Sequence, residues 1–141
     1  MEEKYKKSFK NWKHFYIFAH KLYKMKLKEP YFTVALLPEA TEFVNEQETK
    51  VREKIAYNIN KAQYVMDNEL LKKLNGDIWE FRTMYNGNCY RLLAFWDTNK
   101  KRLILATHGF VKKTDKTPRQ QIEKAELIRK KYFEKYYNKE D

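Results

Sequence analysis

Cationic side chains gather in one stretch of this sequence, and they are the residues best suited to chemistry. Arg82 and Arg91 lie in two β-prone runs, and His108 is followed closely by Lys112 and Lys113. Such cations hold a phosphate and stabilise the extra charge that it gains when an RNA 2′-OH attacks it. A histidine titrating near neutral pH moves protons in the same reaction. The stretch predicts RNA cleavage with a substrate positioned by another molecule, because no strong base accompanies the cations.

Other familiar site types are missing from the sequence. Its three glycines lack the spacing of a phosphate-binding loop, and no residues have metal-ligand spacing. We therefore expect neither a metal nor a cofactor. His14 and His20 belong to the N-terminal segment, where surface or docking roles are expected. His108 has a second interpretation, as a strand histidine bonded to backbone, and the sequence leaves both open.

A tight turn decides how the two arginines meet. Asn86 and Gly87 form the strongest short signal for a two-residue type I′ hairpin. Counting back from the turn sets Arg82 opposite Arg91 on one face of the sheet. Adjacent arginines repel, so either Glu80 or a bound phosphate must compensate their charge. The opposite face is expected to pack on helices through Trp79, Phe81, Tyr90, Leu92 and Ala94.

One strand and a helical hairpin are expected before the arginines. Residues 31–37 are β-prone, and Pro38 followed by an acidic residue marks the start of a short helix. Asn45 and Glu48 have the spacing of a capping pair for a second helix. The apolar stripe of that helix is formed by Val51, Ile55, Ile59, Ala62 and Met66.

A third strand and a last helix are expected after the hairpin. Residues 103–111 are predicted to be a strand that ends in a basic loop. Thr117 is expected to cap the final helix, with Pro118 at its first position. The order β-α-α-β-β-β-α predicts an α+β fold with an antiparallel-rich sheet and the helical hairpin on one face.

Composition limits the partners. The chain has 141 residues and a formal net charge of +11, which favours nucleic acid, an anionic membrane or an acidic protein. A single cysteine, Cys89, excludes an internal disulfide and is predicted to be a small buried residue. No apolar run reaches the length of a membrane span. We expect a cytoplasmic protein that does not bind membranes.

The first 29 residues differ from the rest, so we expect an extension at 1–29 and a compact domain at 30–141. Lysines alternate with aromatic residues there, and the aromatic spacing predicts a helix with one aromatic side. Such a helix either docks on its own domain or serves as a basic arm for RNA or a partner protein. Met25 is an alternative start.

Three runs resemble the phage-related HigB-like branch of the RelE/ParE toxin superfamily, and the resemblance covers residues 31–137. They are Ile78-Trp79-Glu80-Phe81-Arg82, Tyr90-Arg91-Leu92-Leu93 and, most specifically, His108-Gly109-Phe110-Val111-Lys112-Lys113-Thr114-Asp115-Lys116-Thr117-Pro118. The resemblance implies a RelE/ParE-like fold and a type II toxin of a toxin–antitoxin system. Such a toxin cleaves mRNA on the translating ribosome and is neutralised by a helix-turn-helix, HigA-like antitoxin.

Matching residues carry implied roles. Arg82 and Arg91 match the strand arginines of the family, and Lys112 and Lys113 match its basic segment. The hypothesised catalytic residues are Arg82, Arg91, His108 and Lys113, without a metal. The hypothesised RNA-binding residues are Lys72, Lys73, Lys112, Lys116 and Arg119. Two other functions stay open: a ParE-like toxin that inhibits DNA gyrase, and a non-catalytic RNA- or protein-binding relic.

Overall fold

The structure is a computed structural model that describes residues 17–22, 29–107, 110–112 and 116–137. Contacts divide the chain into two units, residues 1–30 and 31–141. In the first unit, residues 17–22 form a short helix, and the rest of the predicted aromatic helix lies outside the described residues. The second unit contains every other described helix and strand.

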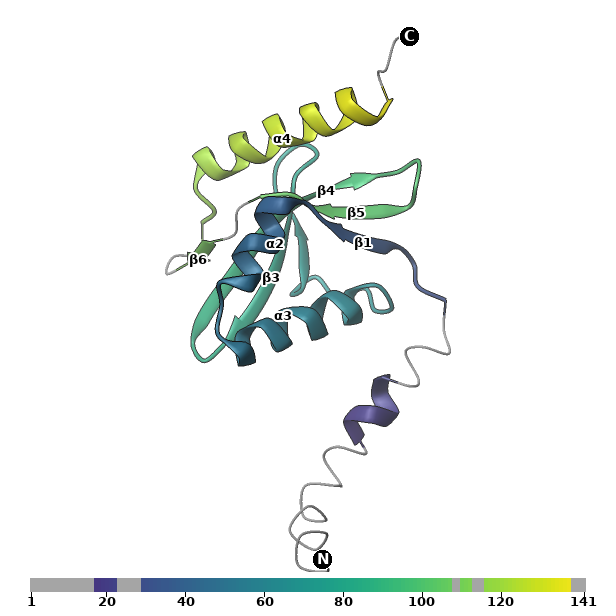
Figure 1. Cartoon of the computed structure of the whole chain (residues 1–141), viewed down its shortest axis with the longest axis vertical. Helices are drawn as coiled ribbons and strands as arrows, with labels where there is room; N and C mark the ends of the chain where they lie inside the picture. Colours follow the sequence, from purple (N-terminus) through teal and green to yellow (C-terminus); the bar gives the residue numbers. More distant parts are fainter. Residues whose placement is uncertain (1–16, 23–28, 108–109, 113–115, 138–141) are drawn as a thin grey trace, which may run out of the picture. The chain divides into compact units, whose positions relative to one another are not determined.

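The second unit is an α+β fold around one mixed sheet (Figure 1). Its elements in chain order are β1 (Thr33–Leu36), α2 (Pro38–Asn45), α3 (Thr49–Ala62), β2 (Leu71–Lys73), β3 (Trp79–Tyr85), β4 (Asn88–Asp97), β5 (Arg102–Leu105), β6 (Phe110–Lys112) and α4 (Arg119–Tyr137). The strand order is β1-β5-β4-β3-β2, and β6 also pairs with β4. Only the β1–β5 pair is parallel in the described sheet, which confirms the antiparallel-rich prediction.

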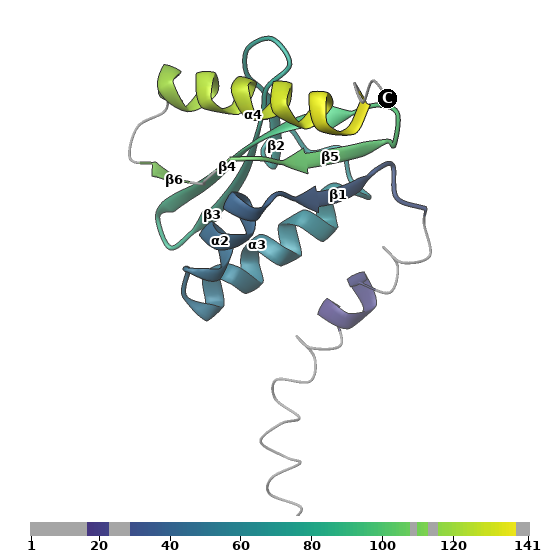
Figure 2. The ribbon, with the colours of Figure 1, turned by 45° about the horizontal axis from the view of Figure 1, so that its top comes forward.

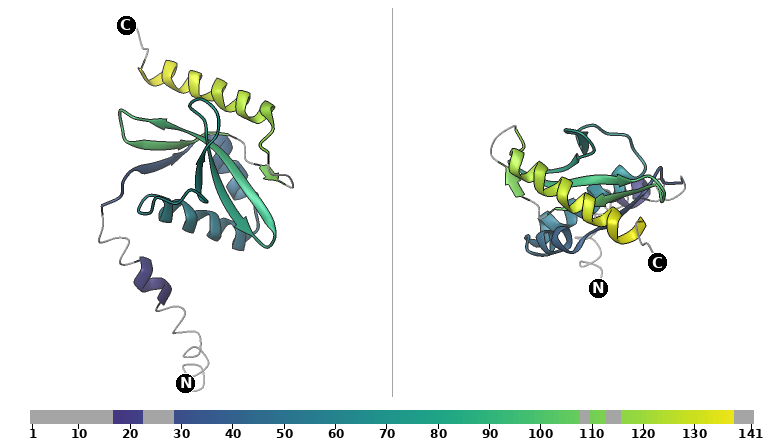
Figure 3. Two further views of the ribbon diagram at one scale, coloured as in Figure 1. Left: turned by 180° about the vertical axis from the view of Figure 1, so that it is seen from behind. Right: turned by 90° about the horizontal axis from the view of Figure 1, so that it is seen from above.

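Helices cover both faces of the sheet. On one face, Phe81, Leu92 and Ala94 pack with Phe43 of α2 and Ala62 of α3, which confirms the predicted core face. On the other face, a second cluster forms beneath α4 from Ile78, Leu93, Phe95, Ala125 and Tyr132. Figures 2 and 3 show α4 crossing the strands on that side. The face that carries the arginines is therefore partly covered, which the hairpin alone did not predict.

The helical hairpin departs from its prediction at the ends of α3. Asn45 is the last residue of α2, and Glu48 precedes α3 without a side-chain capping bond, so the predicted capping pair is wrong. The helix ends at Ala62, and Met66 beyond it is 81% exposed rather than part of the apolar stripe. The stripe is otherwise confirmed, because Val51 and Ile55 are buried with Ala62.

The predicted strand 103–111 is broken in the middle. β5 and β6 pair with different parts of β4, and a bulge separates them. The backbone N–H groups of Ala106 and Thr107 both donate to the Leu93 carbonyl, at 2.9 and 3.3 Å. The Leu93 N–H donates to Thr107 Oγ1 at 2.9 Å, so a buried hydroxyl replaces the missing backbone acceptor. Ala106 and Thr107 thus both oppose Leu93, as in a β-bulge.

Candidate functional site

The Asn-Gly hairpin brings Arg82 and Arg91 together as predicted. Asn86 and Gly87 have φ values of 51° and 81°, in the left-handed region that a type I′ turn requires at both positions. β3 and β4 pair outward from this turn, and the register places Arg82 opposite Arg91. Cys89 is buried nearby, which confirms its predicted role as a small core residue.

A buried carboxylate lies between the two arginines. Glu80 is 1% exposed, and its Oε1 accepts a hydrogen bond from Arg91 Nη1 at 2.5 Å. The Nε of Arg82 lies 3.9 Å from the same oxygen. A buried carboxylate of this kind is stabilised only when cations and hydrogen bonds compensate its lost hydration. Glu80, one of the two alternatives from the sequence, therefore balances the arginine pair in this structure.

The two arginines differ in their access to solvent. The Arg91 side chain is 8% exposed, whereas that of Arg82 is 26% exposed. Within the described residues, the Nε atoms of both arginines are buried and have no hydrogen-bond partner. A guanidinium is a rigid fork of donors that suits phosphate oxygens. Arg82 is thus the member of the pair that can contact a substrate, and Arg91 holds Glu80.

Thr117 connects the basic loop to this cluster. Its hydroxyl donates to the second carboxylate oxygen of Glu80. α4 begins at Arg119, and the Pro118 carbonyl accepts from the Gln121 N–H at 3.0 Å. The predicted start of the helix was therefore too early, and the threonine bonds Glu80 because a charged acceptor makes the stronger hydrogen bond. The end of the basic loop is fixed beside the arginines.

The lysines of β2 fall on two faces of the sheet. Lys72 pairs with Glu80 across the β2–β3 ladder, and Lys73 pairs with Trp79. Successive strand residues point to opposite faces, so Lys72 shares the face of Arg82 and Lys73 shares the face of Trp79. Both lysines are exposed. Only Lys72 is therefore placed to extend the arginine site directly.

The remaining predicted site residues lie at different places, and two of them are outside the described residues. Lys112 lies on β6 at the register position opposite Cys89. Lys116 is exposed, and Arg119 forms a surface ion pair with Glu123 at 3.0 Å. His108 and Lys113 lie outside the described residues. The sequence indicated Glu80 only as a compensating charge, although its place two residues before Arg82, on the same face of β3, was a usable signal.

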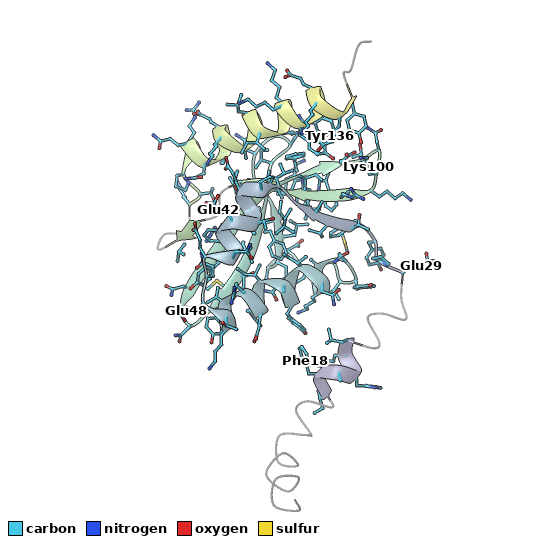
Figure 4. All side chains as sticks on the ribbon, in the orientation of Figure 1. Phe18, Glu29, Glu42, Glu48, Lys100 and Tyr136 are labelled. Carbon is cyan, nitrogen blue, oxygen red and sulfur yellow. The ribbon has the colours of Figure 1, made fainter. Side chains whose placement is uncertain are left out.

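A second buried carboxylate lies at the other end of α4. Asp97 accepts hydrogen bonds from the hydroxyl of Tyr132 at 2.7 Å and from that of Tyr137 at 2.7 and 2.8 Å. Burial alone would raise the pKa of Asp97, but these hydrogen bonds outweigh it and lower the pKa. Burial and the bond to Asp97 raise the pKa of Tyr132. In Figure 4, Tyr136 lies beside Lys100, whose Nζ is 5.6 Å from its ring centroid.

The described residues contain neither a metal-binding group nor a membrane-spanning helix. No group of three or more histidine, cysteine, aspartate or glutamate side chains in this part of the chain could hold a metal ion. No helix among the residues that the structure describes is both long enough and apolar enough to cross a bilayer.

Comparison with known proteins identifies the class of protein. The family of phage-derived Gp49-like proteins (DUF891) matches residues 42–130, more than half of the 141-residue chain. This family consists of toxins of toxin–antitoxin systems and belongs to the RelE/ParE-like toxin superfamily. The chain is a member of the Gp49-like family. Membership implies an antitoxin partner, and Gp49-like toxins are generally ribonucleases. Comparison with curated proteins gave no match.

Proposed function

We propose that this toxin is an endoribonuclease of the HigB-like branch that cleaves mRNA on the translating ribosome. The observation that carries the proposal is the arrangement of Arg82 beside the buried Glu80–Arg91 pair. The geometry presents one partly exposed guanidinium, held near a carboxylate, in a chain with a formal net charge of +11. Such an arrangement suits a phosphate that gains negative charge during the reaction.

The reaction is an attack of the ribose 2′-oxygen on the neighbouring phosphorus, which breaks the bond to the 5′-oxygen. Arg82 contacts the phosphate and stabilises the extra charge in the transition state. Arg91 is a positioning residue, because its guanidinium is buried against Glu80. His108 transfers the proton between the 2′-OH and the leaving 5′-oxygen, and Lys113 adds a second cation beside the phosphate. No metal takes part in this scheme.

The ribosome has a chemical role in this proposal. The Glu80 carboxylate is not available as a strong base, because it already accepts hydrogen bonds from Arg91 and Thr117. A site of this kind depends on a substrate that is held with its 2′-oxygen in line with the scissile bond. In this proposal the ribosome holds the mRNA in that geometry. The charges that attract the RNA come from Lys72, Lys73, Lys112, Lys116 and Arg119. A helix-turn-helix antitoxin blocks this face or its approach.

The test is to induce the chain in bacteria and map new mRNA 5′ ends. We expect cuts in phase with codons, and we expect them to disappear in Arg82→Ala and His108→Ala. Lys50→Ala is the matched control, because Lys50 is an exposed cation on α3, away from the arginines. Cleavage by the purified protein should require added ribosomes.

Other outcomes would contradict the proposal. Arrested growth with intact transcripts and inhibited DNA supercoiling would identify a ParE-like gyrase inhibitor instead. Cuts that persist in Arg82→Ala would exclude the proposed phosphate contact. Cleavage of free mRNA without ribosomes would remove the dependence on translation. Co-expression of the neighbouring reading frame tests the antitoxin, which should restore growth if it encodes a helix-turn-helix protein of the proposed kind.

A further inference from the structure

A second cationic feature lies at the end of the sheet, away from the arginine pair. It is a cavity of about 400 Å³ between the loop that follows β2, the adjoining ends of β3 and β4, and α4. The side chains that matter in its lining are Lys73, Asp77, Trp79, Trp96, Arg129 and Phe133. They combine aromatic rings with two cations and one carboxylate, and of these residues the function proposed above uses only the charge of Lys73.

The cations of this cavity are incompletely paired. Arg129 Nη1 lies 3.6 Å from Asp77 Oδ2, a distance longer than a good hydrogen bond. The Nε of Arg129 is buried and has no hydrogen-bond partner within the described residues. Lys73 is exposed and forms no ion pair in the part of the chain that the structure describes. The lining thus has one positive charge in excess and donors that suit an anion.

The aromatic rings give the cavity flat walls. Trp79 and Trp96 meet edge to face, with ring centroids 6.0 Å apart and an interplanar angle of 86°. The Arg129 guanidinium lies 5.0 Å from the centroid of the Phe133 ring, which holds this cation above the ring. Tryptophan rings and guanidinium planes are both surfaces on which nucleic-acid bases stack.

We propose that this cavity binds one nucleotide of single-stranded RNA, with the base against the tryptophans and its phosphate on Lys73 and Arg129. The inference rests on the proposed function, since it supplies a second contact for the same RNA. Trp79 is three residues from Arg82 along β3, or roughly 10 Å. Lys72 lies between the two sites on the adjoining strand and faces the arginine side. Trp79 and Arg82 point to opposite faces of the sheet, so an RNA that contacts both sites passes over the edge strand β2.

The acidic groups around the cavity predict that one variant, Asp77→Asn, binds RNA more tightly. Asp77 pairs with Arg129 and would compete with a phosphate for it. Glu126 on α4 is also near, since its Oε1 lies 3.7 Å from the position of a Cβ added to Gly76. Removing the charge of Asp77 should release Arg129, so Asp77→Asn is expected to bind RNA more tightly than the unchanged protein.

The experiment measures binding without cleavage. The full chain is titrated against a fluorescein-labelled, 2′-O-methylated RNA hexamer, which lacks the attacking hydroxyl, at several salt concentrations. In the double variant Lys73→Gln, Arg129→Gln, the slope of log K against log salt should fall by about 0.7 for each cation removed. Lys50→Gln, Lys130→Gln is the matched control, because it removes two exposed cations outside the cavity. Circular dichroism verifies that each variant is folded.

Competition separates a nucleotide site from a simple anion site. AMP should displace the hexamer more effectively than ribose 5-phosphate, and Trp79→Ala should weaken AMP binding roughly five- to 150-fold, the range expected for lost stacking. Equal competition by the two molecules would overturn the base contact. A double variant that matches the control, or an Asp77→Asn variant that binds no tighter, would overturn the cavity as an RNA site.

Failure of this inference and failure of the proposed function give different results. Arg82→Ala should lose cleavage yet keep AMP binding at the cavity. If the protein binds AMP through Lys73 and Arg129 but never cuts mRNA, the nucleotide site is supported and the ribonuclease function is contradicted. If the double variant cleaves mRNA in phase with codons and binds the hexamer as the unchanged protein does, the ribonuclease function is supported and the cavity is not an RNA site.

Discussion

Each end of α4 is held to the sheet by a buried carboxylate, and the two carboxylates have different partners. Near the start of the helix, Glu80 is buried and accepts from Thr117; near its end, Asp97 is buried and accepts from Tyr132 and Tyr137. Glu80 also holds the cationic Arg91, whereas the hydrogen bonds to Asp97 come from neutral hydroxyls. The helix is therefore anchored twice by a carboxylate on β3 or β4.

The difference between these clusters separates structure from function. At Asp97, the donors are tyrosine hydroxyls, which carry no positive charge to bind a phosphate. At Glu80, one arginine is buried as a support, and its neighbour Arg82 keeps an exposed fraction of 26%. We infer that the Asp97 cluster stabilises the fold, while the Glu80 cluster presents a cation to substrate.

Loss of the carboxylate at Glu80 should have the largest effect. Glu80→Ala leaves Arg91 buried without its partner, a change that costs about 3–5 kcal/mol of unfolding free energy. Urea denaturation of the purified variant measures it. Glu123→Ala is the control, because it breaks only the surface pair with Arg119 and should cost less than about 1 kcal/mol. Similar losses in the two variants would show that Glu80 does not anchor the cluster.

Loss of the exposed arginine should affect activity rather than stability. Arg82→Ala is expected to slow mRNA cleavage about 10²- to 10³-fold, as for other groups that stabilise charge in a transition state. Its unfolding free energy should change by less than about 1 kcal/mol, because its ion pair with Glu80 is long. Single-turnover cleavage on programmed ribosomes and urea denaturation measure the two effects. A variant that unfolds easily but retains its cleavage rate would reverse our assignment.

The tyrosines at the other end of α4 should show the opposite pattern. Tyr132→Phe removes a buried hydrogen bond to a charged group, which costs about 1.5–3 kcal/mol. Tyr137→Phe should cost less, because Tyr137 is 39% exposed whereas Tyr132 is 8% exposed. Cleavage by both folded variants should match the unchanged protein. A loss of cleavage without a loss of stability would place Asp97 in the functional site.

The pH dependence of stability should be the smallest difference between the two ends. The pKa of Asp97 is lowered in the folded state, so its contribution is complete above the unfolded pKa and is lost as pH falls through the folded pKa. The pKa of Tyr132 is raised, so its contribution is complete below the ordinary value of about 10 and is lost as pH rises above it. Melting temperatures measured across pH should fall at both the acid and the alkaline end of the range.

A matched variant isolates the acid limb. Asp97→Asn cannot titrate, so the stability gap between it and the unchanged protein should narrow as pH falls below about 4. A gap that stays constant down to pH 2 would contradict the assignment of the acid limb to Asp97. Tyr132→Phe provides the same comparison above pH 10.

The sequence predicted the centre of the fold better than its edges. The Asn86-Gly87 turn determined the register of β3 and β4, since a two-residue turn fixes every later pair in the ladder. The apolar stripe of α3 was equally clear up to Ala62. The three-residue strand β2 was not predicted, because so short a strand has no period of its own and forms by pairing with the edge of β3. The HigB-like branch remains a prediction.

The break between β5 and β6 shows why the candidate site was only partly predictable. Residues 103–111 alternate well enough for one strand, and nothing local indicates that the Thr107 hydroxyl will replace a backbone acceptor. The same is true of Thr117, whose place before a proline predicts a helix cap. Its actual partner, Glu80, lies 37 residues earlier in the chain. Hydrogen bonds over such distances leave no periodic signal.

The sequence by itself determined that Arg82 and Arg91 are neighbours, because a turn of two residues is a local property of the chain. Only the tertiary structure decided which arginine is a support and which is accessible. Glu80 is buried because α4 covers that face of the sheet, and Arg91 is buried with it. Burial and long-range partners depend on how distant segments pack, and they give two identical side chains different roles.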